Sequence, residues 1–113
     1  MHEMAIAENL IKIIREEMKI NGADRLRSVL LHVGALTAVV PEALSFSFGL
    51  IISGTELDGA DLIIESIPLR GICADCGREF EIREFEFVCP GCEGTDISEL
   101  SGQELSIIEM EVG

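Results

Sequence analysis

The sequence predicts an α+β fold, in which two helices pack on a three-stranded sheet and a small module with four cysteines is inserted between two strands. Three observations support this prediction. Two segments repeat apolar residues at helical spacing, three short segments are rich in Val, Leu and Ile, and the cysteines fall between the second and third of those segments. With 113 residues, 48% of them hydrophobic, the chain is long enough for one core and an appended module.

The first helix is expected from about residue 5 to residue 19. Apolar residues recur there at spacings of three and four, which is typical of an amphipathic helix. Asn21-Gly22 then supplies a left-handed stop. The apolar stripe consists of Ala7, Ile11, Ile14 and Met18, widened by Ile6, Leu10 and Ile13.

The second helix is expected to begin at Pro41, because proline suits the first turn of a helix. Glu42 favours the positive end of the helix, and Ser53-Gly54 ends it. The apolar face of this helix is formed by Leu44, Phe48 and either Ile51 or Ile52.

Three strands follow from shorter patterns. The first covers residues 25–33, the second begins with Leu62-Ile63-Ile64 and stops at Pro68, and the third covers residues 105–112. In the first strand the expected core face carries Arg27 at its edge, followed by Val29, Leu31 and Val33. The opposite face carries Leu26, Ser28, Leu30 and His32. We therefore expect an α+β domain from residues 1–70 plus 101–113, and a metal-binding domain from residues 71–100.

The cysteines form two matched pairs, Cys73-Ala74-Asp75-Cys76 and Cys89-Pro90-Gly91-Cys92. Two residues between thiols let both sulfurs of a pair reach one ion from a tight turn, and two such turns supply a tetrahedron of thiolates, which suits zinc. Such a site is closed to substrate, so it predicts structural zinc. The N-terminus lacks a basic start and a long apolar run, so we expect a cytoplasmic protein, and in that reducing compartment the pairs indicate metal binding, not disulfides.

The stretch between the pairs alternates polar and apolar residues, which predicts a small hairpin and a zinc-ribbon-like module with four cysteine ligands. Gly77 and Gly91 are expected to permit the tight turns around the sulfurs. Side chains expected to pack beside the metal are Phe80, Ile82, Phe85 and Phe87. Stacking of these rings on nucleic-acid bases is disfavoured, because the net charge of the chain is −13.

His2 is a second candidate metal ligand because of its position. Taken alone, a histidine near a terminus is usually a solvated side chain. Here the terminal amine, the amide nitrogens of His2 and Glu3, and the His2 imidazole lie in one short segment. Four such nitrogens can surround a metal in a plane, which selects nickel(II) or copper(II), not zinc.

The chain resembles the HypA/HybF family of hydrogenase nickel-incorporation proteins over essentially its whole length. The resemblance begins at Met1-His2-Glu3 and continues through Gly34 and the segment Val39-Val40-Pro41-Glu42-Ala43-Leu44. It then includes the two cysteine pairs and ends at Ser101-Gly102-Gln103-Glu104-Leu105. The order of these motifs is specific, although each alone is weak.

The resemblance implies a nickel metallochaperone that passes Ni(II) to the large subunit of nickel–iron hydrogenase together with a nickel-loading maturation GTPase, and in some organisms serves urease maturation. It implies that His2 is the essential nickel ligand and that Glu3 contributes through its backbone, with its side chain as a further candidate ligand. It also implies that Cys73, Cys76, Cys89 and Cys92 hold structural Zn(II). His32 has no partner ligand nearby in sequence, so we expect a solvated side chain there.

Other classes of function fit the sequence less well. An enzyme is not expected, because the chain shows no nucleophile–base arrangement, phosphate-binding glycine loop or open zinc position. The main alternative is a zinc-ribbon adaptor that binds proteins and has no nickel role. Neither membrane insertion nor nucleic-acid binding is expected.

Overall fold

The structure is a computed structural model and describes residues 3–113. These residues form two α-helices, a short 3-10 helix and six strands in two three-stranded sheets. In chain order the elements are α1 (Glu3–Ile20), β1 (Leu26–Gly34), η1 (Ala35–Thr37), α2 (Pro41–Ile52), β2 (Asp61–Ile67), β3 (Arg70–Cys73), β4 (Glu79–Glu81), β5 (Ile97–Ser101) and β6 (Leu105–Val112). The predicted α+β class, with two helices on a three-stranded sheet and an inserted cysteine module, is confirmed.

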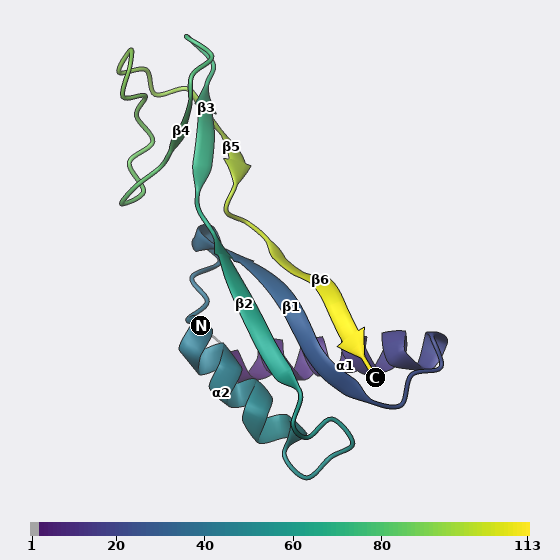
Figure 1. Cartoon of the computed structure of the whole chain (residues 1–113). Helices are drawn as coiled ribbons and strands as arrows, with labels where there is room; N and C mark the ends of the chain where they lie inside the picture. Colours follow the sequence, from purple (N-terminus) through teal and green to yellow (C-terminus); the bar gives the residue numbers. More distant parts are fainter. Residues whose placement is uncertain (1–2) are drawn as a thin grey trace.

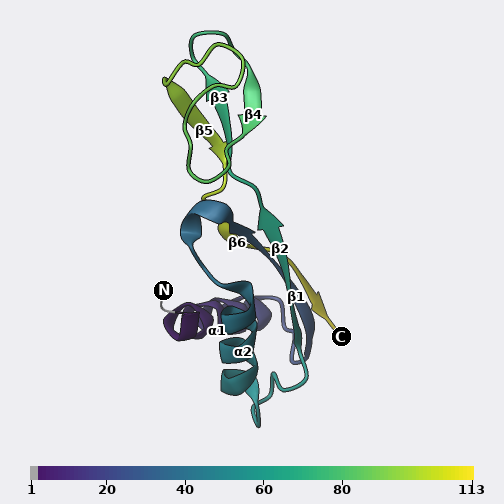
Figure 2. The ribbon, with the colours of Figure 1, turned by 90° about the vertical axis from the view of Figure 1, so that its left-hand side faces the viewer.

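The first sheet has the strand order β2-β1-β6, and both helices cover one of its faces (Figure 1). β1 pairs with β2 in parallel and with β6 in antiparallel orientation. The second sheet, β4-β3-β5, lies at the other end of an elongated molecule whose principal axes measure 54 × 26 × 16 Å (Figures 1 and 2). No helix formed by residues 3–113 is long and apolar enough to cross a membrane.

Both predicted helices form where expected. After α1, Gly22 has a φ of +67° and the Ala23 N–H donates to the Met18 carbonyl at 2.8 Å, which is the expected left-handed stop. α2 begins at Pro41 and is followed by Gly54 at a φ of +78°. The buried residues of the two helices are Ala7, Leu10, Ile11, Ile14 and Met18 in α1, and Leu44, Ser47, Phe48 and Ile52 in α2.

The assignment of faces at the start of β1 was wrong. Leu26 is buried and Arg27 is exposed, the reverse of the alternation we expected. The reason is a β-bulge: Leu26 pairs with Val112 and Ser28 pairs with Glu111, which leaves Arg27 as an extra residue. Beyond the bulge the alternation holds, because Val29, Leu31 and Val33 are all buried.

The two sheets meet at a junction between the end of β1 and the connection from β5 to β6. The Gly34 N–H donates to the Glu104 carbonyl at 2.6 Å, and the Leu36 N–H donates to the Gly102 carbonyl at 2.8 Å. Gly102 has a φ of +115°, and its N–H donates to the Glu104 carboxylate at 2.7 Å. A Cβ on Gly34 would overlap the Gly102 carbonyl, so the backbones can approach this closely only with glycine.

The hairpin expected between the cysteine pairs does not form: residues 77–88 contain one strand, β4, and it pairs with β3. β4 covers three residues, and the chain then turns through Glu84 and Phe85, whose φ angles of 54° and 58° are left-handed. Phe80 and Ile82 are buried and Phe87 packs against them, as expected. Phe85 is 64% exposed, so its expected place beside the cysteines is wrong. Two further strands, β3 and β5, were not expected from the sequence.

Candidate metal centre

The four cysteines come together at the far end of the second sheet. Cys73 ends β3, Cys76 follows in the next turn, and Cys89 and Cys92 lie in the loop between β4 and β5. Their four sulfurs all lie within 4.8 Å of one another. The Cys73–Cys92 and Cys76–Cys89 sulfur pairs are both 3.5 Å apart, far beyond the length of a disulfide bond of about 2.05 Å.

The two cysteine turns have the same pattern of backbone hydrogen bonds. In the first, the Cys73 N–H donates to the Arg78 carbonyl at 2.9 Å and the Gly77 N–H donates to the Cys73 carbonyl at 2.8 Å. In the second, the Cys89 N–H donates to Gly94 and the Glu93 N–H donates to Cys89, both at 2.9 Å. The repeated C-x-x-C spacing therefore produces two equivalent turns that face each other.

The glycine expected to permit the second turn was misassigned. Gly77 has the positive φ of the first turn, 74°, but its counterpart in the second turn is Glu93 at 62°, not Gly91. Gly91 instead lies close to Arg78, since a Cβ built on it would be 3.2 Å from Arg78 Nη1 and 3.8 Å from Cys89 Sγ. Glu93 therefore adopts a left-handed backbone conformation, which is unfavourable for a residue with a Cβ.

The arrangement fits a tetrahedral ion bound by thiolates. Zinc bound to four sulfurs at about 2.3 Å places them about 3.8 Å apart, near the separations found here. The first cysteine of each pair is buried and the second is exposed, so such an ion would lie at the surface of the module. Four sulfurs complete a tetrahedron and leave no position for a substrate.

Backbone amides and neighbouring sulfurs set the acidity of the thiols in opposite directions. N–H donors of Cys92 and, to a smaller extent, Gly91 lower the pKa of Cys89 to about 6. At Cys92 the Gly94 N–H acts in the same direction, but the sulfurs of Cys73 and Cys76 outweigh it and raise the pKa to about 12. The pKa of Cys76 is also raised: the Arg78 N–H lowers it, and the Cys89 sulfur and burial outweigh that effect. Without a cation the cluster therefore favours the thiolate at Cys89 and the thiol at Cys76 and Cys92, and a cation is required to hold four thiolates together.

Gly94 is a residue of the centre that the sequence analysis missed. A Cβ on it would be 2.7 Å from Asp75 Oδ2, 3.2 Å from Cys92 Sγ and 3.4 Å from Cys73 Sγ. The Gly94 backbone therefore forms a wall of the sulfur cluster. The matched spacing of the two cysteine pairs could have indicated Gly94 as part of the centre. Gly94 follows Cys92 by two residues, and Arg78 follows Cys76 by two residues, so the two residues occupy equivalent positions in their turns.

The second predicted site falls at the start of the chain, and His2 lies outside the described residues. Glu3 begins α1, and its Oε2 accepts a hydrogen bond from the Val40 N–H at 3.2 Å, directly before α2. A shallow groove of about 570 Å³ lies beside it, lined by Glu3, Met4, Ala5, Glu8, Ala43, Phe46 and Ser47. The Glu3 side chain thus links the beginnings of the two helices next to the predicted nickel segment.

Among residues 3–113, His32 does not belong to a group of side chains that could share a metal ion. Its Nε2 lies 2.8 Å from Glu65 Oε1 on the neighbouring strand β2, and its side chain is 26% exposed. Across residues 3–113, the four cysteines form the one group of three or more His, Cys, Asp or Glu side chains close enough to share an ion. His32 is therefore partly buried and paired, more so than the solvated histidine we expected.

Known proteins resemble this chain over its full length. Residues 1–112 match the family model described as hydrogenase/urease nickel incorporation, metallochaperone, HypA. Proteins named hydrogenase maturation factor HypA are 40% identical in Geobacter metallireducens and 39% identical in Geotalea uraniireducens, with 99% of both chains covered in each comparison.

Solved structures show the same fold. The solution structure of the Ni metallochaperone HypA from Helicobacter pylori superposes with a TM-score of 0.68 at 22% identity, covering 99% of this chain and 97% of the other. A second HypA solution structure gives 0.72 at 23% identity, covering 99% and 96%. With a match to the family model from residue 1 to residue 112, this chain belongs to the HypA family of hydrogenase and urease nickel-incorporation metallochaperones.

Proposed function

We propose that this protein carries nickel for the maturation of nickel–iron hydrogenase, binding Ni(II) at its N-terminus through His2 and Glu3. The observation that carries the proposal is the family match, which includes the N-terminal segment as well as all four cysteines. Nickel is the cargo in this proposal and zinc is a resident ion. The protein acts as a carrier and catalyses no reaction.

The N-terminal segment offers nitrogen ligands that suit nickel. The terminal amine, two amide nitrogens and the His2 imidazole can form a plane, a geometry that selects Ni(II) or Cu(II) over zinc. The Glu3 carboxylate already accepts the Val40 N–H, which favours a contribution of Glu3 through its backbone nitrogen. Since imidazole, amine and amides must be deprotonated, nickel affinity should fall as the pH is lowered.

The cysteine module has a structural role in this proposal. Cys73, Cys76, Cys89 and Cys92 hold zinc as thiolates, and the ion supplies the charge that lets four thiolates lie together. Residues 71–100 then form a zinc-binding domain, and residues 1–70 with 101–113 form the nickel-binding domain. The separate sheets and the separate hydrophobic clusters support a division into two domains. At the boundary, the second cluster also includes Leu69, and the second sheet extends to Arg70 and Ser101.

The proposed partners follow from the family. They are a nickel-loading GTPase and the large subunit of nickel–iron hydrogenase, together with urease maturation proteins in organisms that have urease. The family description names both enzymes, and the relatives are named hydrogenase maturation factors. The proposed place of action is the cytoplasm, where thiols remain reduced and available to zinc. The net charge of −13 attracts cations and steers a basic partner, and both effects should weaken with salt.

Calorimetric titration of untagged, zinc-loaded protein with nickel tests the proposal. We expect His2→Ala to abolish tight nickel binding and to leave zinc content and the circular dichroism spectrum unchanged. His32→Ala is the matched control, because the chain has two histidines and His32 is paired with Glu65. Nickel binding by His2→Ala with unchanged affinity would contradict the N-terminal site.

The same titration tests the alternative of a zinc-ribbon adaptor without a nickel role. The exposed Phe85 and Val88 of the cysteine module, 64% and 47% accessible, favour a protein-binding surface there. An adaptor would take up nickel only as zinc leaves the cysteines, so zinc release in step with nickel uptake identifies it.

A further inference from the structure

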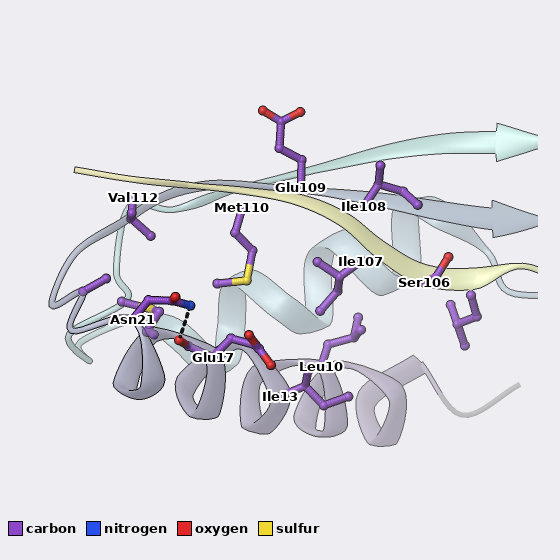
Figure 3. A pocket seen from close by; sticks show the side chains of 13 residues that line it. Leu10, Ile13, Glu17, Asn21, Ser106, Ile107, Ile108, Glu109, Met110 and Val112 are labelled. Carbon is purple, nitrogen blue, oxygen red and sulfur yellow. Dashed lines mark hydrogen bonds between the residues drawn. The ribbon is translucent and has the colours of Figure 1, made fainter.

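We propose that the groove between α1 and β6 binds an extended, basic segment of a partner protein, which adds to the first sheet as a strand beside β6. The groove has a volume of about 770 Å³ and lies where the edge of the sheet faces α1 (Figure 3). None of the residues that line the groove is a cysteine or a proposed nickel ligand, and the inference does not depend on nickel binding. The residues that line the groove are Leu10, Ile13, Glu17, Met18, Asn21, Ala23, Leu105, Ser106, Ile107, Ile108, Glu109, Met110 and Val112.

The inner surface of the groove is apolar because of a β-bulge in β6. Ile107 and Met110 are three residues apart, so a regular strand would direct them to opposite faces. β6 has an extra residue at Ile108, because Leu30 pairs with Glu109 while Leu31 pairs with Ile107. Both side chains therefore point toward α1, where Ile13 lies 42% exposed (Figure 3).

The strand above the groove is an open sheet edge. β6 ends the strand order β2-β1-β6, and no element formed by residues 3–113 pairs with its outer side. It is eight residues long and contains neither proline nor lysine, which natural edge strands often use to prevent pairing. Leu105, Ile108 and Val112 are 40%, 51% and 46% exposed. A long apolar edge beside an apolar groove is the arrangement in which strand addition binds extended peptides.

Charge decides between the occupants of such a groove. Among the described residues that line it, both charged ones are glutamates, Glu17 and Glu109. A second copy of this chain would bring the same glutamates and a further net charge of −13. A segment that alternates apolar residues with Lys or Arg places its apolar side chains toward α1. Its basic side chains then lie on the face to which Glu109 points (Figure 3).

The test uses an eight-residue capped peptide that alternates Val and Lys, added to zinc-loaded, isotope-labelled full-length protein and followed by NMR. We expect saturable shifts of the backbone signals of β6 and of Leu10, Ile13 and Glu17. A Val–Glu peptide of the same length should not bind. A Val–Lys peptide with alternate backbone nitrogens methylated should not bind either, because strand addition needs those N–H donors.

Two variants of α1 locate the groove. Ile13→Ser should weaken binding of the Val–Lys peptide about tenfold, because it removes apolar surface from the groove. Ile20→Ser is the matched control, since Ile20 is 77% exposed on the same helix and does not line the groove; it should leave the affinity unchanged. His2→Ala should also leave it unchanged, which separates this surface from the nickel site.

Several outcomes would overturn the proposal. They are the absence of shifts on β6, equal binding of the Val–Glu peptide or of the methylated peptide, and equal effects of the two isoleucine variants. Self-association through β6 in sedimentation and NMR, without peptide, would assign the groove to a second copy of the chain and would likewise contradict the proposal.

Discussion

The two ends of the molecule are stabilised by different means. Among the described residues, the core between the helices and the first sheet contains fourteen buried hydrophobic residues, whereas the cluster at the second sheet contains five, two of which are cysteines. The first region can be held together by burial of apolar surface. The second has too small a core for that, so we infer that its fold depends on the ion that its cysteines bind.

The largest expected effect is that of zinc removal or of Cys73→Ala. Structural zinc sites contribute about 10–16 kcal/mol of binding free energy, which in such modules is folding free energy. Hydrogen exchange should show loss of protection in β3, β4 and β5, while α1 and β1 stay protected. Unchanged protection in the zinc-free second sheet would show that its small core suffices.

Leu31→Ala makes the corresponding test of the first region. Leu31 is fully buried in β1, so truncation should lower the free energy of unfolding of this region by about 3–4 kcal/mol. Denaturant titration with a parallel zinc assay should show lower stability with unchanged zinc content. Leu50→Ala, at a position 54% exposed on α2, is the control and should cost less than about 0.5 kcal/mol. Equal losses from the two variants would argue against a packed core.

The next effect is that of pH on zinc binding to the cysteines of the second region. Cys76 and Cys92 have raised pKa values and are protonated at pH 7 without metal, so zinc binding must release at least these two protons. Zinc affinity should therefore fall at least about a hundredfold for each pH unit below 7. Because the pKa of Cys89 is about 6, the Cys89 thiolate also takes up a proton below that pH. Competition with a chelator at several pH values measures this, and a flat profile would contradict four-thiolate binding.

Gly34→Ala tests the junction that joins the two regions. The added Cβ would overlap the Gly102 carbonyl and lie 2.7 Å from the Gln103 nitrogen, so overpacking should cost about 2 kcal/mol. Gly49→Ala is a control of opposite sign, because its Cβ would meet nothing within 4 Å in the middle of α2; it should stabilise the protein by about 0.5–1 kcal/mol. Thermal unfolding compares the two, and a stable Gly34→Ala protein would show that the close approach is not needed.

The smallest effect concerns the two cysteine turns. Glu93→Gly should stabilise the module by about 1 kcal/mol, because it relieves the left-handed backbone at Glu93. Gly77→Ala, at the equivalent position of the first turn, should destabilise it by about the same amount. Zinc-loaded denaturation monitored at the second sheet provides the measurement. Effects of the same sign would show that the turns are not equivalent.

The sequence predicted the helices and the three strands of the first sheet because long periodic segments determine them. The assignment of faces failed where a strand contains an extra residue: the bulge at Arg27 reverses the faces expected for Leu26 and Arg27. The bulge at Ile108, in a strand for which no faces were predicted, turns both Ile107 and Met110 toward α1 (Figure 3). Bulges depend on pairing between distant strands, and a single strand's alternation does not show them.

The cysteine module illustrates the same limit at shorter range. The spacing of Cys73, Cys76, Cys89 and Cys92 was sufficient to predict that their sulfurs meet. The left-handed turn at Glu84 and Phe85 was not predicted, because neither residue is of a type that favours it. The close approach of Gly94 to the sulfurs depends on how the two turns face each other, which spacing alone does not specify.

X-ray absorption at the zinc and nickel edges of one untagged sample, loaded with one equivalent of nickel, tests most directly whether the two regions hold different metals. We predict four sulfurs about 2.3 Å from zinc, unchanged in His2→Ala. The nickel edge should show nitrogen and oxygen ligands with an imidazole that His2→Ala removes. Sulfur around nickel with loss of zinc from the cysteines would contradict the account.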